Sequence, residues 1–174
     1  MSGMPAAYRN IIEPLIEIAR GIVETGETLS HMAFVGNLRT GETKIVPMVT
    51  PSDQAKDEAA AMLRHVAHLL QADFVFVIMD AWTLPSDKVA RYQEILDEYG
   101  SIGASPYRID AIAFNLETRH GMWCAQVPVK PKGVSKRKKT FGEPQFQLFD
   151  GVQGRFANLL PVADDDHVAA GKLH

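Results

Sequence analysis

The chain has 174 residues, of which 46% are hydrophobic and 22% are charged, with a formal net charge of −3. This length fits one domain with a sizeable core, and the composition excludes a disordered chain. The longest apolar run, residues 74–79, is too short to span a membrane, and the N-terminal region lacks the continuous apolar core of a signal peptide. The single cysteine, Cys124, cannot form an internal disulfide, so we expect a reducing, cytoplasmic setting.

The first 71 residues predict a helix, a hairpin and a second helix. An apolar stripe over residues 5–26 predicts a helix, in which Pro14 either lies in the first turn or kinks a longer helix. We prefer a helix over 14–25 after a looser turn at 5–12. Residues 32–38 and 43–48 predict a β-hairpin whose second strand lies at a sheet edge, because Pro47 cannot donate to a ladder. Ser52 or Asp53 caps a helix to about residue 71. Its predicted apolar face consists of Ala55, Ala59, Met62, Leu63, Val66, Leu69 and Leu70.

Residues 72–82 predict the central strand of the fold. Six consecutive large apolar residues follow Asp73, which is typical of a strand buried on both faces. A short helix is expected from Pro85, then a second hairpin at 107–117 and 122–129, and a last strand at 145–150. The inward residues of the short helix are predicted to be Val89, Tyr92, Ile95 and Leu96.

This order of elements predicts an α+β fold, because strands and helices do not alternate as they do in a doubly wound sheet. We expect a largely antiparallel or mixed sheet of about five to six strands, with two to three helices packed on one of its faces. A single domain should cover residues 1–163 and carry a basic loop at 130–140. Residues 164–174 are predicted to form a flexible C-terminal tail.

The catalytic candidates are weak. Asp80 lies at the end of the most buried strand, where a partly desolvated carboxylate could act as a base, with His31 or His65 as its partner. The alternative, which we favour, is a structural role for Asp80 and a core position for Trp82. We therefore favour a protein that is not an enzyme over a hydrolase.

No cofactor and no metal ion are expected. The sequence has no phosphate-binding glycine loop, nucleophile elbow or zinc motif. His65 and His68 are three residues apart but point mostly away from the predicted apolar face, which favours surface histidines. The acidic cluster at 164–167 lacks the fixed geometry of a cation site.

The clearest charge pattern is a basic segment. Six of the 18 basic residues lie within residues 130–139, which leaves 12 basic against 21 acidic residues in the rest of the chain. Such a segment can neutralise phosphates, and an aromatic residue just after it could stack on a base. The predicted nucleic-acid-binding residues are Lys130, Lys132, Lys136, Arg137, Lys138, Lys139 and Phe141.

The hairpin with Gly41, the helix at 53–71 and the strand ending in Asp80-Ala81-Trp82 carry a resemblance. Over residues 30–128 the chain resembles small uncharacterised α+β proteins of bacteria and phages. No activity comes with this resemblance, which implies a bacterial or phage source.

The leading hypothesis is a non-enzymatic accessory protein that binds nucleic acid or another polyanion through the basic loop. A first alternative is a protein-binding or virion/host-interaction module that acts through a sheet edge, and a second is a hydrolase using Asp80 with a histidine. We expect no membrane partner, and we expect a homo-oligomer formed through a sheet edge or the N-terminal helix.

Overall fold

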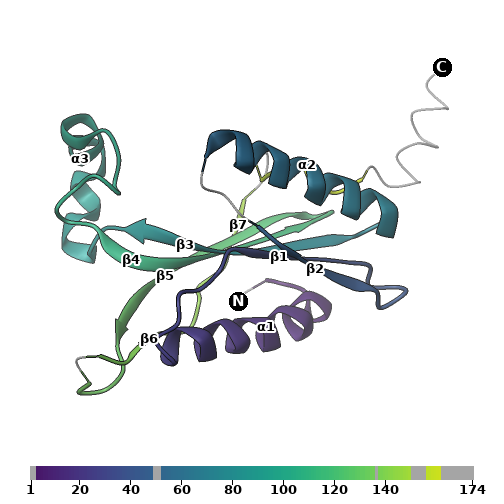
Figure 1. Ribbon diagram of the computed structural model, residues 1–174, viewed down its shortest axis with the longest axis horizontal. Coiled ribbons are helices and arrows are strands. Elements are labelled where there is room, and N and C mark those ends of the chain that lie inside the picture. The colour runs from purple at the N-terminus through teal and green to yellow at the C-terminus, as the bar shows by residue number, and fades with distance from the viewer. Residues whose placement is uncertain (1–2, 49–51, 136, 150–155, 162–174) are drawn as a thin grey trace.

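The computed structural model describes residues 3–48, 52–135, 137–149 and 156–161 (Figure 1). In these residues a seven-stranded antiparallel sheet has the order β2-β1-β3-β4-β5-β6, and β7 also pairs with β5. The strands are β1 (Met32–Gly36), β2 (Thr43–Pro47), β3 (Phe74–Thr83), β4 (Ile109–Thr118), β5 (Gly121–Pro131), β6 (Lys139–Phe141) and β7 (Gln147–Phe149). The helices are α1 (Ala6–Glu24), α2 (Asp53–Leu70), the 3₁₀ helix η1 (Ser86–Arg91) and α3 (Tyr92–Tyr99). The predicted α+β class is confirmed.

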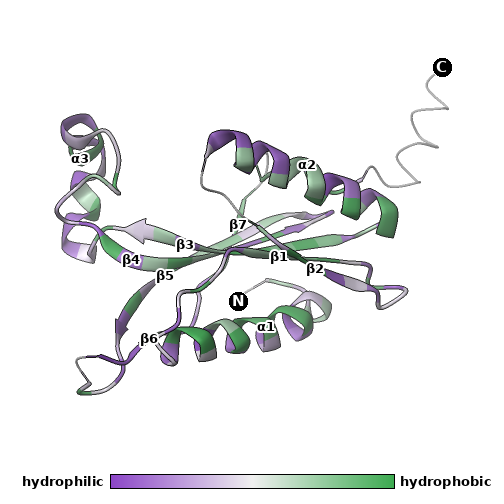
Figure 2. Cartoon of the chain, viewed as in Figure 1, coloured by the Kyte–Doolittle hydropathy of each residue, from purple (hydrophilic) through white to green (hydrophobic). Residues whose placement is uncertain are grey.

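Strand β3 is central, as predicted, and is buried on both faces over its first half. Phe76 and Ile78 face α1, whereas Val75 and Val77 face α2. The two helices therefore cover opposite faces of the sheet, and the expectation that they share one face is wrong (Figure 1). Two apolar faces on one strand need two covering layers. Figure 2 shows hydrophobic residues along the central strands and alternation of hydrophobic and hydrophilic residues along both helices.

Helix α1 begins earlier than the preferred prediction and runs through Pro14, as in the alternative of a longer helix. Its buried residues continue at three- and four-residue spacing on both sides of the proline: Tyr8, Ile12, Ile16, Ala19 and Val23. Pro14 and Asn10 are exposed, so water can bind the Asn10 carbonyl that loses its helical hydrogen bond. Burial of the continuous apolar stripe outweighs the cost of the proline.

The bounds of α2 are close to the prediction, but its buried face is narrower. The Ser52 hydroxyl caps the helix by accepting a 3.1 Å hydrogen bond from the Ala55 N–H. Ala60, Leu63 and Ala67 are the buried residues of the helix, and they lie three and four positions apart. The predicted face was wrong for Met62 and Leu69, which are exposed. Small alanines let the helix lie close to the sheet.

The hairpins β1–β2 and β4–β5 are confirmed, and β2 is an edge strand as predicted. Strand β6 was not predicted, because three residues are too few for a periodic pattern. Of the residues predicted to point inward in the helix after Pro85, Ile95 is buried, whereas Val89 and Tyr92 are exposed.

The segment 156–161 is held against the α2 face of the sheet by Glu117. The Glu117 carboxylate accepts hydrogen bonds from the N–H groups of Leu159 (2.8 and 2.9 Å) and Leu160 (2.7 Å). Burial raises the pKa of Glu117, and the backbone N–H bonds offset part of this effect. Leu159 is buried beside Leu63 and Val75. The tail predicted at 164–174 lies outside the described residues.

Candidate functional site

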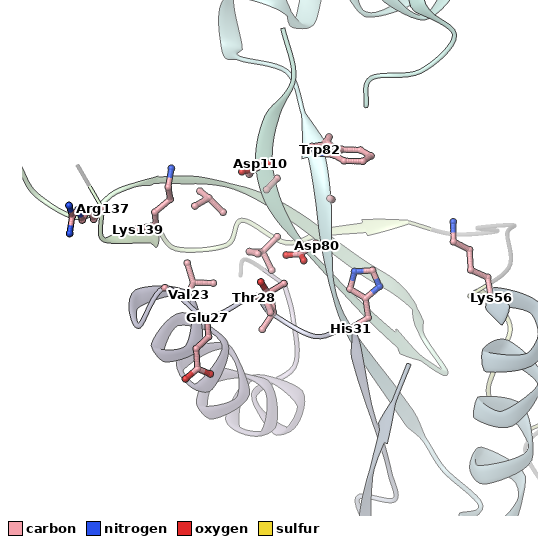
Figure 3. Close-up of a pocket in the computed structure, with 16 residues that line it drawn as sticks. Val23, Glu27, Thr28, His31, Lys56, Asp80, Trp82, Asp110, Arg137 and Lys139 are labelled. Atoms are coloured by element: carbon pink, nitrogen blue, oxygen red, sulfur yellow. The ribbon is translucent and has the colours of Figure 1, made fainter. Parts of the chain in front are cut away.

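A pocket of about 600 Å³ lies beyond the C-terminal end of α1 and over the end of β3 (Figure 3). Its lining includes Asp80, Trp82 and Asp110 from the strands, and Arg137 and Lys139 from the basic segment. The pocket thus joins two regions that the sequence placed about fifty residues apart: the end of the central strand and the basic segment.

The pocket exists because the sheet is longer than the helix that covers it. Helix α1 ends at Glu24, while β3 continues to Thr83. Burial along β3 is complete from Phe74 to Ile78 and then gives way to intermediate and exposed positions. Asp80 and Trp82 therefore continue the apolar face of Phe76 and Ile78 into the region beyond the end of α1.

Asp80 and His31 lie in the same pocket. The pocket walls withhold water from the Asp80 carboxyl, although much of its surface is exposed, and this desolvation raises its pKa. A charged His31 opposes the rise, whereas the Asp110 carboxylate adds to it. His65 is exposed on α2 and is not part of the pocket lining. The structure places Asp80 and His31, but not His65, in the lining of one pocket. The hypothesis of a hydrolase that uses Asp80 with His31 stays a prediction.

Trp82 is not a core residue, which corrects the sequence-based interpretation. Its side chain is 53% exposed and is held by the loop between α3 and β4. Gly103 packs so closely on the indole that a Cβ there would lie 2.6 Å from Cζ3. The Arg108 guanidinium lies 5.4 Å from the ring centroid and donates a hydrogen bond to the Gly103 carbonyl. The ring is thus supported from the loop and still lines the pocket.

We call residues 130–141 the basic arm. Its described residues, 130–135 and 137–141, form a hairpin at the paired ends of β5 and β6. The Lys132 N–H donates to the Lys138 carbonyl at 2.9 Å, and the Ser135 hydroxyl accepts from the N–H groups of Arg137 (3.3 Å) and Lys138 (3.0 Å). These bonds give the arm a defined turn. The sequence predicted a loop without regular structure here, and β6 with its turn replaces it.

Phe141 anchors the root of the arm and cannot stack on a base. Its side chain is 2% exposed and its ring lies 5.8 Å from that of Phe114, centroid to centroid. The Arg20 guanidinium lies 4.6 Å from the Phe141 ring centroid and donates to the Gly142 carbonyl at 3.1 Å. The predicted stacking role of Phe141 is wrong, because the β5–β6 pairing turns this ring into the core.

The predicted cations of the arm differ in their surroundings. Lys132 donates to Glu24 at 2.9 Å, and this hydrogen bond lowers the pKa of the Glu24 carboxyl. The Thr140 hydroxyl donates to the same carboxylate at 3.2 Å. Lys132 and Thr140 therefore link the arm to the end of α1, and the Glu24 carboxylate offsets part of the Lys132 charge.

The other cations of the arm are presented to solvent. Lys130, Arg137, Lys138 and Lys139 are exposed, while Lys136 lies outside the described residues. Figure 3 shows the Arg137 and Lys139 side chains at one end of the pocket and Lys56 at the other. The carboxylates of Asp80 and Asp110 lie between them. A third carboxylate, that of Glu27, lines the pocket on the α1 side. The pocket is thus basic at these two ends and acidic in the middle and beside α1.

The remaining predictions concern metals, membranes and the sheet edge. Within the described ranges, no group of three or more His, Cys, Asp or Glu side chains could hold a metal ion, and no helix is long and apolar enough to cross a bilayer. The edge strand β2 exposes Ile45 but is short and carries Lys44 and Pro47, features that oppose pairing with another strand. The sheet-edge partner stays a prediction.

Comparison with protein-family models, with curated protein sequences and with solved structures finds no match for this chain. The resemblance to bacterial and phage proteins also stays a prediction. Function therefore has to be argued from the pocket and the basic arm themselves.

Proposed function

We propose that this protein binds nucleic acid through the basic arm, without a catalytic step. The observation that carries the proposal is the exposure of Arg137, Lys138 and Lys139 on a hairpin that is fixed at its root. An ordered hairpin presents its charges together, so less conformational entropy is lost when they meet a row of phosphates.

The root of the arm supports this role. Glu24 compensates Lys132, and Phe141 is locked into the core under Arg20. Neither contact uses the exposed cations, so the root can hold the arm while the distal residues bind a ligand. The acidic body of the protein repels a polyanion and restricts contact to the arm.

The test is the salt dependence of binding. Affinity for a fluorescent single-stranded 12-mer and for a duplex of the same length is measured by fluorescence anisotropy from low to moderate salt. Each phosphate contact contributes about 0.7 to the slope of log K against log salt for a single strand. Replacing Lys136, Arg137, Lys138 and Lys139 by Ala should weaken binding at low salt and flatten the slope by about 2–3.

The matched control removes exposed cations elsewhere. Arg39→Ala with Lys44→Ala takes two positive charges from the β1–β2 hairpin, which is exposed and outside the pocket lining. This variant should keep the affinity and the slope of the unmodified protein. If the arm variant also keeps both, the arm does not bind nucleic acid.

A further inference from the structure

The pocket beside the basic arm has a chemical pattern of its own. Trp82 and Asp110 are directly opposite each other in the β3–β4 ladder, so their side chains are neighbours on one face of the sheet. An exposed indole that is supported from behind therefore lies beside a carboxylate acceptor. Both line the same pocket as Arg137 and Lys139.

The distribution of charge restricts what can occupy the pocket. The carboxylates of Asp80 and Asp110 repel phosphate from the middle of the pocket, and that of Glu27 repels it from the α1 side. The cations attract phosphate to the two basic ends (Figure 3). A ligand that fits has a flat, uncharged part with hydrogen-bond donors for the middle and an anionic part for the end. A nucleotide residue of a single strand has these two parts, with its base and its phosphate.

Duplex DNA does not meet the same requirements. Its bases are stacked and paired, so a flat ring face reaches a pocket only when the strand is single or the base is extruded. Trp82 is also well suited to stacking, because Gly103 and Arg108 fix its ring before any ligand arrives.

We infer that the pocket takes an unpaired nucleobase of a single strand, which stacks on Trp82 and donates a hydrogen bond to Asp110 while its phosphate meets Arg137 and Lys139. The inference rests on the proposed function and adds to it the class of nucleic acid and the base edge. Cytosine offers an exocyclic amino donor at its N4, whereas thymine has a carbonyl acceptor at the equivalent O4. An aspartate that reads this edge prefers cytosine.

The experiment compares oligo(dC) and oligo(dT) 12-mers, which match in length and charge, by anisotropy at one salt concentration. Trp82→Ala should weaken binding of the single strand by about 5- to 150-fold, the range expected from losing one stacked base. Trp82→Phe should retain most of the affinity. The slope against salt should stay unchanged in both variants, because the phosphate contacts remain.

The base preference is tested separately. The unmodified protein should bind oligo(dC) at least about 5-fold more tightly than oligo(dT), and Asp110→Asn should remove most of that difference. An asparagine of the same shape still fits the pocket but no longer supplies a charged acceptor. Thermal unfolding of each variant controls for loss of fold.

Intrinsic fluorescence gives a readout that does not depend on removing Trp82. The chain has two tryptophans, and Trp123 is 6% exposed, so a Trp123→Phe variant isolates the exposed indole. Its emission should be quenched on addition of oligo(dC). Salt-dependent binding that is insensitive to Trp82, with no quenching, would overturn this inference and leave the proposed function standing. If the unmodified protein shows no salt-dependent binding to any of the oligonucleotides, both this inference and the proposed function are overturned.

Discussion

Glu117→Gln tests whether one buried carboxylate fastens the segment 156–161 to the rest of the protein. Glu117 is 8% exposed and accepts hydrogen bonds from two backbone N–H groups, those of Leu159 and Leu160. Glutamine has nearly the same shape but one acceptor oxygen, and its NH₂ group would face a backbone N–H. If the glutamine oxygen takes the place of Oε2, it still accepts from both N–H groups, but the NH₂ in the place of Oε1 faces the Leu159 N–H and is a buried donor without an acceptor.

The magnitude follows from the contacts that are lost. A hydrogen bond to a charged group contributes about 1.5–3 kcal/mol, and an unsatisfied buried donor costs about 1–3 kcal/mol. Glutamine also removes the cost of burying a charge, which is the reason that the pKa of Glu117 is raised, and this offsets part of the loss. We expect a net destabilisation of about 1–3 kcal/mol.

The assay is urea unfolding followed by circular dichroism, with hydrogen exchange at the Leu159 and Leu160 amides as a local readout. The control is Glu42→Gln on the exposed β1–β2 turn, which should leave the urea midpoint unchanged. The Glu117 variant should unfold at lower urea and should exchange faster at both amides. An unchanged midpoint together with unchanged exchange at the two amides would refute the anchoring role of the carboxylate.

Two further predictions concern stability. Gly36→Ala should destabilise the fold by about 1–3 kcal/mol in urea unfolding, because the added Cβ overlaps the Phe74 ring. Gly21→Ala should stabilise it by about 0.5–1 kcal/mol, because Gly21 lies inside α1 and its added Cβ would meet nothing within 4 Å. A destabilising Gly21→Ala would contradict this reasoning. Because the pKa of Asp80 is raised in the folded state, the folded protein binds this proton more tightly, and stability from Asp80 is lost as pH rises through that pKa. The stability of Asp80→Asn relative to the unmodified protein should therefore increase as the pH rises from the ordinary aspartate pKa through the raised one. A difference in stability that is constant with pH would exclude the shift.

The elements of this protein follow largely from local sequence signals. A run of large apolar residues predicts the buried strand β3, and Ser52, whose hydroxyl caps α2, predicts the start of that helix. The hairpin strand with Pro47 lies at the edge of the sheet, where a residue that cannot donate to a ladder is tolerated. These features depend on the residues in the element itself, so the sequence is sufficient to find them. The positive charge of the basic arm can likewise be found from the sequence alone.

What those residues do was decided by contacts between distant parts of the chain. Phe141 and Trp82 were assigned the wrong environments, because burial of an aromatic ring depends on register and on which helix covers it. Glu117 gives no local signal, since its donors lie 42 and 43 residues further along the chain.

The pocket itself is a tertiary feature in the same sense. It exists because α1 ends before β3 does, and because the arm is fastened to that helix end through Glu24. Local sequence signals are sufficient to find a strand ending in Asp80 and Trp82 and a separate basic segment. Only the antiparallel order β3-β4-β5-β6 places the two side by side, since adjacency across a sheet depends on pairing and not on distance along the chain.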